Sequence, residues 1–255
     1  MGNIAGLVLS VVLAVLAGGW IALGRLAMPP LLVWAAVAAL GLTVAGCALQ
    51  REIRAGADNP SRGAADFTVF AGVLIDLMGA ALVGGVAVLM GLAALAVMIA
   101  YSRVLERRGP VGDLALAALA GLPFAYGASA VGRAAGATVP WVLAGWLQLI
   151  RAMVSDLERE SVDRTRGRRT LAVRLGQSHA AMVSAVFALA FIPASLVLPV
   201  RAGYGGAYFL LALFAQLAVL ITAARLIVGR MDGVSLLLKA AMVMGAVAMV
   251  AGRVT

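Results

Sequence analysis

The stretch FTVFAGVLIDLMGAALVGGVAVLMGLAALAVMIAY, residues 67–101, is almost entirely apolar over 35 consecutive positions and contains one charged residue, Asp76. As a single α-helix it would be about 52 Å long, whereas the hydrocarbon core of a bilayer is about 30 Å thick. One spanning helix is therefore excluded. Glycine disfavours a helix interior, and the pair Gly84-Gly85 lies near the middle of the stretch. We therefore predict two membrane-spanning helices that meet at this pair.

The rest of the chain has the same apolar character. Of its 255 residues, 64% are hydrophobic and 12% are charged, whereas a soluble domain is about half apolar and a quarter charged. The apolar residues form unbroken blocks, which excludes the alternating pattern of a membrane β-barrel. Seven further blocks are long enough to span a bilayer, at residues 4–24, 31–49, 111–132, 138–154, 181–200, 206–228 and 234–251. The sequence predicts an all-α membrane protein with nine transmembrane helices.

Arginines are distributed unevenly between the two sides that these nine helices define. Fifteen fall on the side of the N-terminus and four on the other, while Lys239 lies within the ninth helix. Because basic residues stay on the cytoplasmic side, we predict a cytoplasmic N-terminus in the cell membrane. Ten of the eleven acids share that side. The net charge of +9 is interpreted as this topology signal and as attraction to anionic lipid, not as nucleic-acid binding.

Cysteine and histidine chemistry is largely excluded. Cys47 is the single cysteine, so there is no disulfide framework and no cysteine-based metal site, and we interpret it as a small buried residue. His179 is the single histidine, which argues against a metal site built from several histidines.

Residues 151–176, RAMVSDLERESVDRTRGRRTLAVRLG, combine four carboxylates with seven arginines between two apolar blocks. On one continuous helix, Asp156, Glu160 and Asp163 stand at positions i, i+4 and i+7 and share a face. Carboxylate oxygens are suitable ligands for Mg²⁺, and guanidinium groups suit a phosphate or diphosphate. The alternative is a solvated helix whose charges pair with one another, as most charged faces do.

This segment resembles the second acidic motif of the UbiA superfamily of intramembrane prenyltransferases, REIxKDIEDxEGDRxxGxRTLPVRLG. The matching positions run without a gap and include Arg151, Asp156, Glu158, Asp163, Arg164, Gly167, Arg169, Thr170, Leu171, Val173 and Gly176. Residues 101–122, YSRVLERRGPVGDLALAALAGL, are similar to the family's YSxxLKRxGxxGNLxVAxLxGL. Residues 51–62, REIRAGADNPSR, resemble the end of its first acidic motif, NDxxDREIDAxNxPxRP, with a one-residue offset. Nine helices is also the number found in that family.

The chain departs from the family most clearly in the first acidic motif. The family's Asn and its three Asp positions fall on Gly46, Cys47, Gln50 and Arg54, so that none of the carboxylates remains in register. Glu52 and Asp58 are the nearby carboxylates. In the other stretches, Arg159 replaces an Asp, Glu106 replaces a Lys and Ala172 replaces a Pro.

The resemblance implies a single prenyltransferase domain over residues 1–255, with nine helices around a central cavity that opens to the cytoplasm and to lipid. A polyprenyl diphosphate would donate its isoprenyl group to an apolar, lipid or aromatic acceptor, as in quinone or prenyl-lipid biosynthesis. Mg²⁺, here a single ion, would neutralise the departing diphosphate. The implied metal ligands are Asp156, Glu160, Asp163 and Asp58, of which Asp156 and Asp163 would be catalytic.

The resemblance also assigns the diphosphate-binding residues. Arginines that face a diphosphate would be Arg54, Arg62, Arg107, Arg151, Arg159 and Arg169, with Arg54 and Arg62 replacing the charge of the lost metal. From the residues themselves, Tyr101 and Tyr126 would border the cavity, because their rings can stack on an allylic cation. Asp76 would border it as well, because a mid-membrane carboxylate is costly and is a functional candidate by default. For the tyrosines, ordinary interfacial anchoring is the alternative. For Asp76, the alternative is a structural role, either paired with Lys239 or protonated.

Two classes of function stay open at this point. One is an active prenyltransferase. The other is a catalytically degenerate protein of the same fold that binds lipid or a partner protein, which the altered first motif favours. A transporter is disfavoured because the two halves of the chain show no internal repeat.

Overall fold

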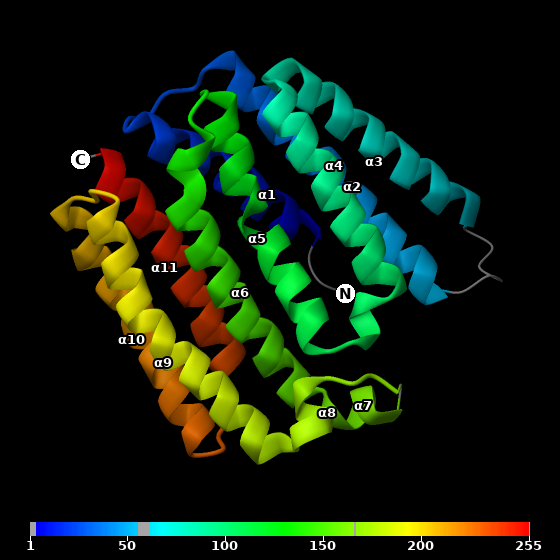
Figure 1. Cartoon of the computed structure of the whole chain (residues 1–255), viewed down its shortest axis with the longest axis vertical. Coiled ribbons are helices and arrows are strands. Elements are labelled where there is room, and N and C mark those ends of the chain that lie inside the picture. Colours follow the sequence, from blue (N-terminus) through cyan, green and yellow to red (C-terminus); the bar gives the residue numbers. More distant parts are fainter. Residues whose placement is uncertain (1–3, 56–61, 166, 255) are drawn as a thin grey trace. The chain divides into compact units, whose positions relative to one another are not determined.

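The computed structural model describes residues 4–55, 62–165 and 167–254, and throughout these ranges the regular secondary structure is helical (Figure 1). Nine of the described helices are long and apolar enough to cross a membrane, which confirms the predicted all-α membrane architecture. These are α1 Ile4–Leu23, α2 Pro30–Ala55, α3 Arg62–Val83, α4 Gly85–Arg103, α5 Pro110–Ala130, α6 Thr138–Glu158, α9 Gln177–Arg201, α10 Gly206–Ile227 and α11 Val234–Val254. The shorter helices are η1 Leu105–Arg107, η2 Ala134–Ala137, α7 Glu160–Thr165 and α8 Leu171–Leu175.

The long apolar block divides where the sequence predicts. Helix α3 ends at Val83 and α4 begins at Gly85. Gly84 between them has a φ of 138°, a conformation that L side chains rarely adopt, and its amide donates to the carbonyl of Ala80 over 2.9 Å. The block therefore forms two spanning helices that meet at Gly84, whose backbone conformation is outside the helical range.

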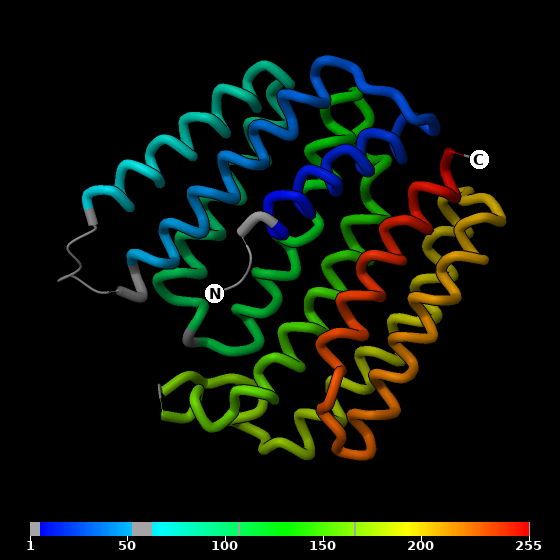
Figure 2. The backbone as a smooth tube through the Cα atoms, turned by 180° about the vertical axis from the view of Figure 1, so that it is seen from behind, coloured from blue at the N-terminus to red at the C-terminus, as the bar shows by residue number. Residues whose placement is uncertain are grey.

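The chain folds into two compact units. Unit 1 consists of Met1–Arg103 and Leu122–Thr138, and unit 2 consists of Val104–Gly121 and Val139–Thr255. The first half of α5 thus belongs to unit 2 and its second half to unit 1. In unit 2, α9, α10 and α11 lie side by side, as both the helix contacts and Figure 2 show.

Unit 1 is held together by close approach of its helix backbones. A Cβ atom added to Gly41 of α2 would lie 2.6 Å from the carbonyl oxygen of Gly72 of α3, and one added to Gly72 would lie 2.6 Å from the carbonyl oxygen of Gly41. Small residues at such crossings allow the van der Waals contact that drives helix association in lipid. In the same unit, Leu32, Ala35 and Ala80 are fully buried in an apolar cluster.

Unit 2 uses polar contacts between its helices. Tyr208 of α10 donates a hydrogen bond to the carbonyl of Ser195 of α9 over 2.6 Å, and Gln216 Nε2 donates to Ser195 Oγ over 3.1 Å. The second bond makes Gln216 an interhelical hydrogen-bonding residue, a common role for a polar side chain within an apolar helix. Directly before α10, the Gly205 amide donates a hydrogen bond to the carbonyl of Gly252 of α11 over 2.8 Å.

Candidate functional site

The acidic segment does not form the single helix that its spacing predicts. Helix α6 ends at Glu158, Arg159 is in a turn, and α7 begins at Glu160. The prediction that Asp156, Glu160 and Asp163 share the face of one continuous helix is therefore wrong. Within α7, Glu160 instead accepts a hydrogen bond from the guanidinium of Arg164 over 2.8 Å, one turn along the same helix. The carboxylate of Glu160 is therefore paired with an arginine of its own helix.

Asp156 and Asp163 nevertheless belong to one cluster of carboxylates, and Asp113 is its third member. The carboxyl group of Asp156, near the end of α6, contacts that of Asp113 in the first turn of α5, and both interact electrostatically with Asp163. Asp113 is 8% exposed and Asp163 is 1% exposed. One oxygen of Asp113 and one of Asp156 are buried without a hydrogen-bond partner. Buried negative charge of this kind favours a bound cation.

Sequence reasoning counted Asp113 among the acids of one side but did not assign it to the site. A signal was nevertheless present in the stretch that resembles the family, because this chain has Gly-Asp-Leu where the family pattern has Gly-Asn-Leu. The contact with Asp156 could not be read from the sequence because it joins α5 to α6 through tertiary structure.

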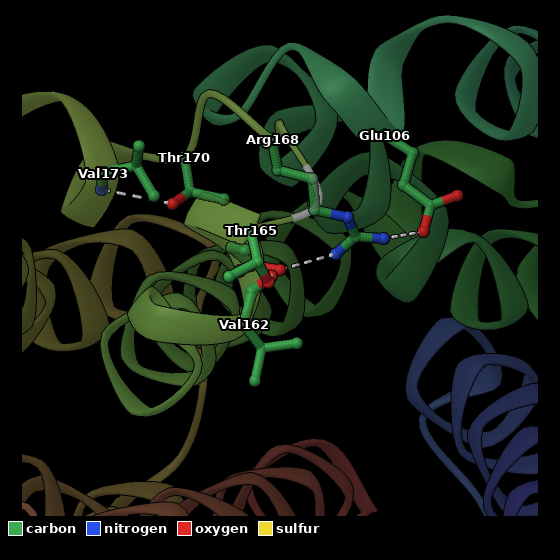
Figure 3. Close-up of polar contacts among 7 residues, drawn as sticks. Glu106, Val162, Thr165, Arg168, Thr170 and Val173 are labelled. Carbon is green, nitrogen blue, oxygen red and sulfur yellow. Dashed lines mark hydrogen bonds and ion pairs between the residues drawn. The ribbon is translucent and has the colours of Figure 1, made fainter.

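Arg168 connects the acid cluster to η1 (Figure 3). Its guanidinium donates one hydrogen bond to Glu106 of η1 and another to Asp163 Oδ1, the second over 3.4 Å. The backbone prepares this arrangement: the amide of Arg168 donates to the carbonyl of Asp163 over 3.0 Å, and Gly167 has a φ of 67°. The chain therefore turns back directly after α7 and brings the Arg168 side chain over the carboxylate of Asp163.

Two further contacts fix the loop around Arg168. Thr170 caps α8, since its hydroxyl accepts from the amide of Val173 over 3.4 Å (Figure 3). Gly109, which precedes α5 and has a φ of 59°, lies so close to Arg169 that an added Cβ atom would be 2.1 Å from the Arg169 carbonyl oxygen. The two stretches with the clearest family resemblance, residues 101–122 and 151–176, thus meet at Gly109 and Arg169, which both belong to unit 2.

The structure describes three of the six arginines that the sequence assigns to diphosphate binding. Arg151 donates to Gln148 Oε1 over 3.2 Å, Arg159 is exposed and attracts Asp156, and Arg169 is exposed beside Gly109. Asp58 and the side chains of Arg54, Arg62 and Arg107 lie outside the described residues.

The remaining candidates belong to unit 1. Tyr126 donates a hydrogen bond to Asp76 Oδ1 over 2.9 Å, and the two side chains are 0% and 1% exposed. A Cβ atom added to Gly91 would lie 2.6 Å from both Asp76 Oδ2 and the Tyr126 hydroxyl. Asp76 and Tyr126 are thus packed tightly together inside the unit, and Tyr126 is the partner that the sequence had not assigned to Asp76. Tyr101 is half-buried in the last turns of α4.

The altered first motif borders apolar space. Cys47, Arg51 and Glu52 line a pocket of about 300 Å³ in unit 1 together with residues of α1 and α3. Cys47 is half-buried there, in partial agreement with its interpretation as a small buried residue. The described part of this motif offers a divalent cation the carboxylate of Glu52 alone.

Among the described residues, no group of three or more His, Cys, Asp or Glu side chains is arranged to enclose a metal ion. Mg²⁺ rarely needs such an enclosure, because proteins usually hold it with one or two carboxylates and leave its other positions to substrate phosphates and water. The buried oxygens of Asp113 and Asp156 that have no hydrogen-bond partner fit this mode of binding. The residues present therefore fit a Mg²⁺ that completes its coordination with ligand oxygens.

Known proteins resemble this chain in sequence and in fold. The digeranylgeranylglyceryl phosphate synthase of Halobacterium salinarum is 33% identical over 207 residues, covering 80% of this chain and 72% of that protein. The synthase of the same name from Natronomonas pharaonis is 31% identical over 245 residues, covering 90% and 87%. A solved UbiA homologue from Aeropyrum pernix has a TM-score of 0.77 at 18% identity, covering 94% of this chain and 97% of that one.

A profile of the UbiA prenyltransferase family matches residues 11–234. This match includes both the altered first motif and the acid cluster, and it agrees with the resemblance noted in the three sequence motifs. An enzyme is therefore supported over a non-catalytic protein of the same fold. The chain belongs to the UbiA prenyltransferase family and is a multi-pass membrane prenyltransferase.

Proposed function

We propose that this prenyltransferase transfers a prenyl group, geranylgeranyl by analogy with its relatives, to the hydroxyl group of a prenylated glyceryl phosphate lipid. One observation carries the proposal: relatives that cover 80% and 90% of the chain are named digeranylgeranylglyceryl phosphate synthases. The product in that name is a glyceryl phosphate with two geranylgeranyl groups. An aromatic acceptor, which the sequence left open, is accordingly the second choice.

The chemistry requires the loss of an allylic diphosphate. The bond between the allylic carbon and the diphosphate oxygen breaks, and both electrons leave with the diphosphate. The acceptor oxygen then forms a bond to the allylic carbon and releases its proton to the diphosphate or to water. Charge on the departing diphosphate must be stabilised, and arginine is suited to this task because its guanidinium forms paired hydrogen bonds with phosphate oxygens. Arg151, Arg159 and Arg169 are the described candidates.

Carboxylates of unit 2 would hold the cation that accompanies the diphosphate. Asp156 and Asp113 have the buried oxygens that fit Mg²⁺, and Asp163 lies beside them. When bound, Mg²⁺ neutralises negative charge on the leaving group. In the same proposal, Arg54 and Arg62 supply positive charge where the first motif has lost its carboxylates, and Asp58 is an additional ligand.

The proposed orientation places this site on the cytoplasmic side of the cell membrane. Fifteen arginines share the side of the N-terminus, and basic residues favour the cytoplasmic face. A water-soluble diphosphate head group would reach the acid cluster from that side, while prenyl chains would approach it from the lipid. Apolar side chains around the reacting carbon would keep water away from it.

Reconstitution tests the proposal directly. The protein in nanodiscs is incubated with radiolabelled geranylgeranyl diphosphate, Mg²⁺ and either geranylgeranylglyceryl phosphate or a phenolic acid, and lipid products are separated. We expect transfer to the glyceryl phosphate lipid at least about tenfold faster than to the phenolic acid. Preference for the phenolic acid would overturn the proposed acceptor. No transfer from any prenyl diphosphate of 10 to 50 carbons would favour a catalytically degenerate member of the family.

A further inference from the structure

Arg168 bonds two largely buried carboxylates, those of Glu106 and Asp163. Its side chain is 21% exposed, and its two partners, Glu106 and Asp163, are 12% and 2% exposed. Asp113 and Asp156 interact electrostatically with Asp163 in the same cluster. Arg159 attracts Asp156 from an exposed position. Arg168 thus bonds a carboxylate of the cluster directly, whereas Arg159 interacts with the cluster electrostatically from an exposed position.

The bonds of Arg168 use only part of its donor capacity. A guanidinium has five N–H donors in a rigid planar fork, and the two described bonds leave donors for another acceptor. The exposed fraction of the side chain allows a phosphate oxygen to reach those donors. A lysine at this position would provide a point charge on a flexible stem and could not hold both carboxylates in a fixed geometry.

The two bonded positions differ in how they relate to the family pattern. Where the family pattern has Lys, this chain has Glu106, and where the pattern leaves the residue open, this chain has Arg168. The two side chains form an ion pair in the structure. A negative charge thus stands at the family's Lys position, next to Arg107 in the sequence, and its guanidinium partner Arg168 also bonds Asp163.

We propose that Arg168 is a positioning residue that holds Asp163 within the acid cluster and supplies, from the polypeptide itself, part of the positive charge that a divalent cation provides. The inference rests on the proposed function, because it concerns the site for Mg²⁺ and diphosphate. It explains how a chain with an altered first acidic motif operates with fewer metal ligands. Arg168 competes with the cation for Asp163 and contributes to binding of the diphosphate.

This role predicts opposite effects for the two partners of one ion pair. In Arg168→Gln, the cluster loses a positive charge, so a divalent cation binds roughly tenfold more tightly, as expected when a unit charge a few ångströms away is removed. In Glu106→Gln, the cluster loses a negative charge while the guanidinium stays, so the cation binds several-fold more weakly. A purely structural ion pair would give the same direction of change in both variants, because both break the same bond.

The experiment measures Mn²⁺ binding to the purified protein by electron paramagnetic resonance, which requires no prenyl transfer. Wild type, Arg168→Gln, Arg168→Lys and Glu106→Gln are compared, and Arg168→Lys should lie near wild type in Mn²⁺ affinity. The matched control is Arg164→Gln, since Arg164 is 64% exposed and pairs with Glu160 within α7. This control should leave Mn²⁺ affinity unchanged within about twofold.

Kinetics then separate the inference from the proposed function. For an active enzyme, Arg168→Gln should raise the KM for prenyl diphosphate about tenfold or more and lower the Mg²⁺ concentration needed for half-maximal rate. Opposite shifts of Mn²⁺ affinity without any prenyl transfer would support the charge role and contradict the proposed function. Shifts in the same direction, no shift, or no Mn²⁺ binding in any variant would overturn the inference.

Discussion

The carboxyl group of Asp113, at the start of α5, contacts that of Asp156, near the end of α6. Two like charges at this distance are unfavourable unless a proton or a cation lies between them. The contact therefore couples the stability of this part of unit 2 to the binding of a positive ion. It also joins two stretches of sequence that each resemble the family.

This contact predicts that Asp113→Asn stabilises the protein in the absence of divalent cations. Removing one of two like charges is worth about 1 kcal/mol or more, which corresponds to a rise in Tm of roughly 2–4 °C. The same change removes a ligand, so the stabilisation by Mg²⁺ should shrink. Thermal unfolding with and without Mg²⁺ measures both effects. A lower Tm in the absence of Mg²⁺ would show that the two carboxyl groups share a stabilising proton instead.

Asp156 and Asp163 should be required for prenyl transfer. Asp156→Ala and Asp163→Ala should each lower the rate by roughly a hundredfold or more, because stabilisation of a charged leaving group is usually the largest contribution of an active site. Initial rates with radiolabelled donor test this, and unchanged far-UV circular dichroism confirms that the variants fold. Full activity in the double variant would remove the acid cluster from the mechanism.

Arg54 should contact the donor diphosphate. A charge-assisted bond to a phosphate is worth about 1.5–3 kcal/mol, so Arg54→Ala should weaken prenyl diphosphate affinity roughly ten- to more than a hundredfold. The pair Gln50→Asp and Arg54→Asp should make binding more dependent on Mg²⁺, since it restores carboxylate ligands. Affinity is measured in nanodiscs with and without Mg²⁺, and Arg230→Ala serves as a control for loss of a loop arginine. Equal affinities of Arg54→Ala and wild type would leave Arg54 as a topology signal only.

Gly91 should be intolerant of any side chain. An alanine Cβ would lie 2.6 Å from both Asp76 Oδ2 and the Tyr126 hydroxyl, so Gly91→Ala should cost about 1–3 kcal/mol of unfolding free energy. Gly85→Ala is the matched control, because a Cβ atom there meets no atom within 4 Å. In a Tyr126→Phe background the cost of Gly91→Ala should fall, since one of the two clashing oxygens is gone. Equal costs in both backgrounds would show that the hydroxyl does not limit the space.

Much of the fold could be predicted because membrane thickness limits the length of a spanning helix. The apolar stretch at 67–101 has 35 residues, too many for one spanning helix, and the division at Gly84 follows from glycine's conformational freedom. The family resemblance likewise depends on one continuous stretch, residues 151–176, and can be recognised without knowing any tertiary contact. Properties that depend on local sequence and on the solvent could therefore be read from the chain.

The site could be predicted only in part, because its geometry depends on contacts between segments. Regular helical spacing suggested a shared face for Asp156, Glu160 and Asp163, but the turn at Arg159 ends the helix. The segment contains seven arginines, and the sequence does not indicate which of them contacts Asp163. The structure shows that it is Arg168. Pairing between the turn before α5 and the loop after α7 is a tertiary property.

The close approach of Gly109 to the carbonyl of Arg169 limits which residues position 109 can hold. An added Cβ atom would lie 2.1 Å from that oxygen, and the φ of 59° is one that L side chains rarely adopt. A side chain at position 109 would therefore push the turn before α5 away from the loop after α7 and disturb the contacts of Arg168 with Glu106 and Asp163 that join them.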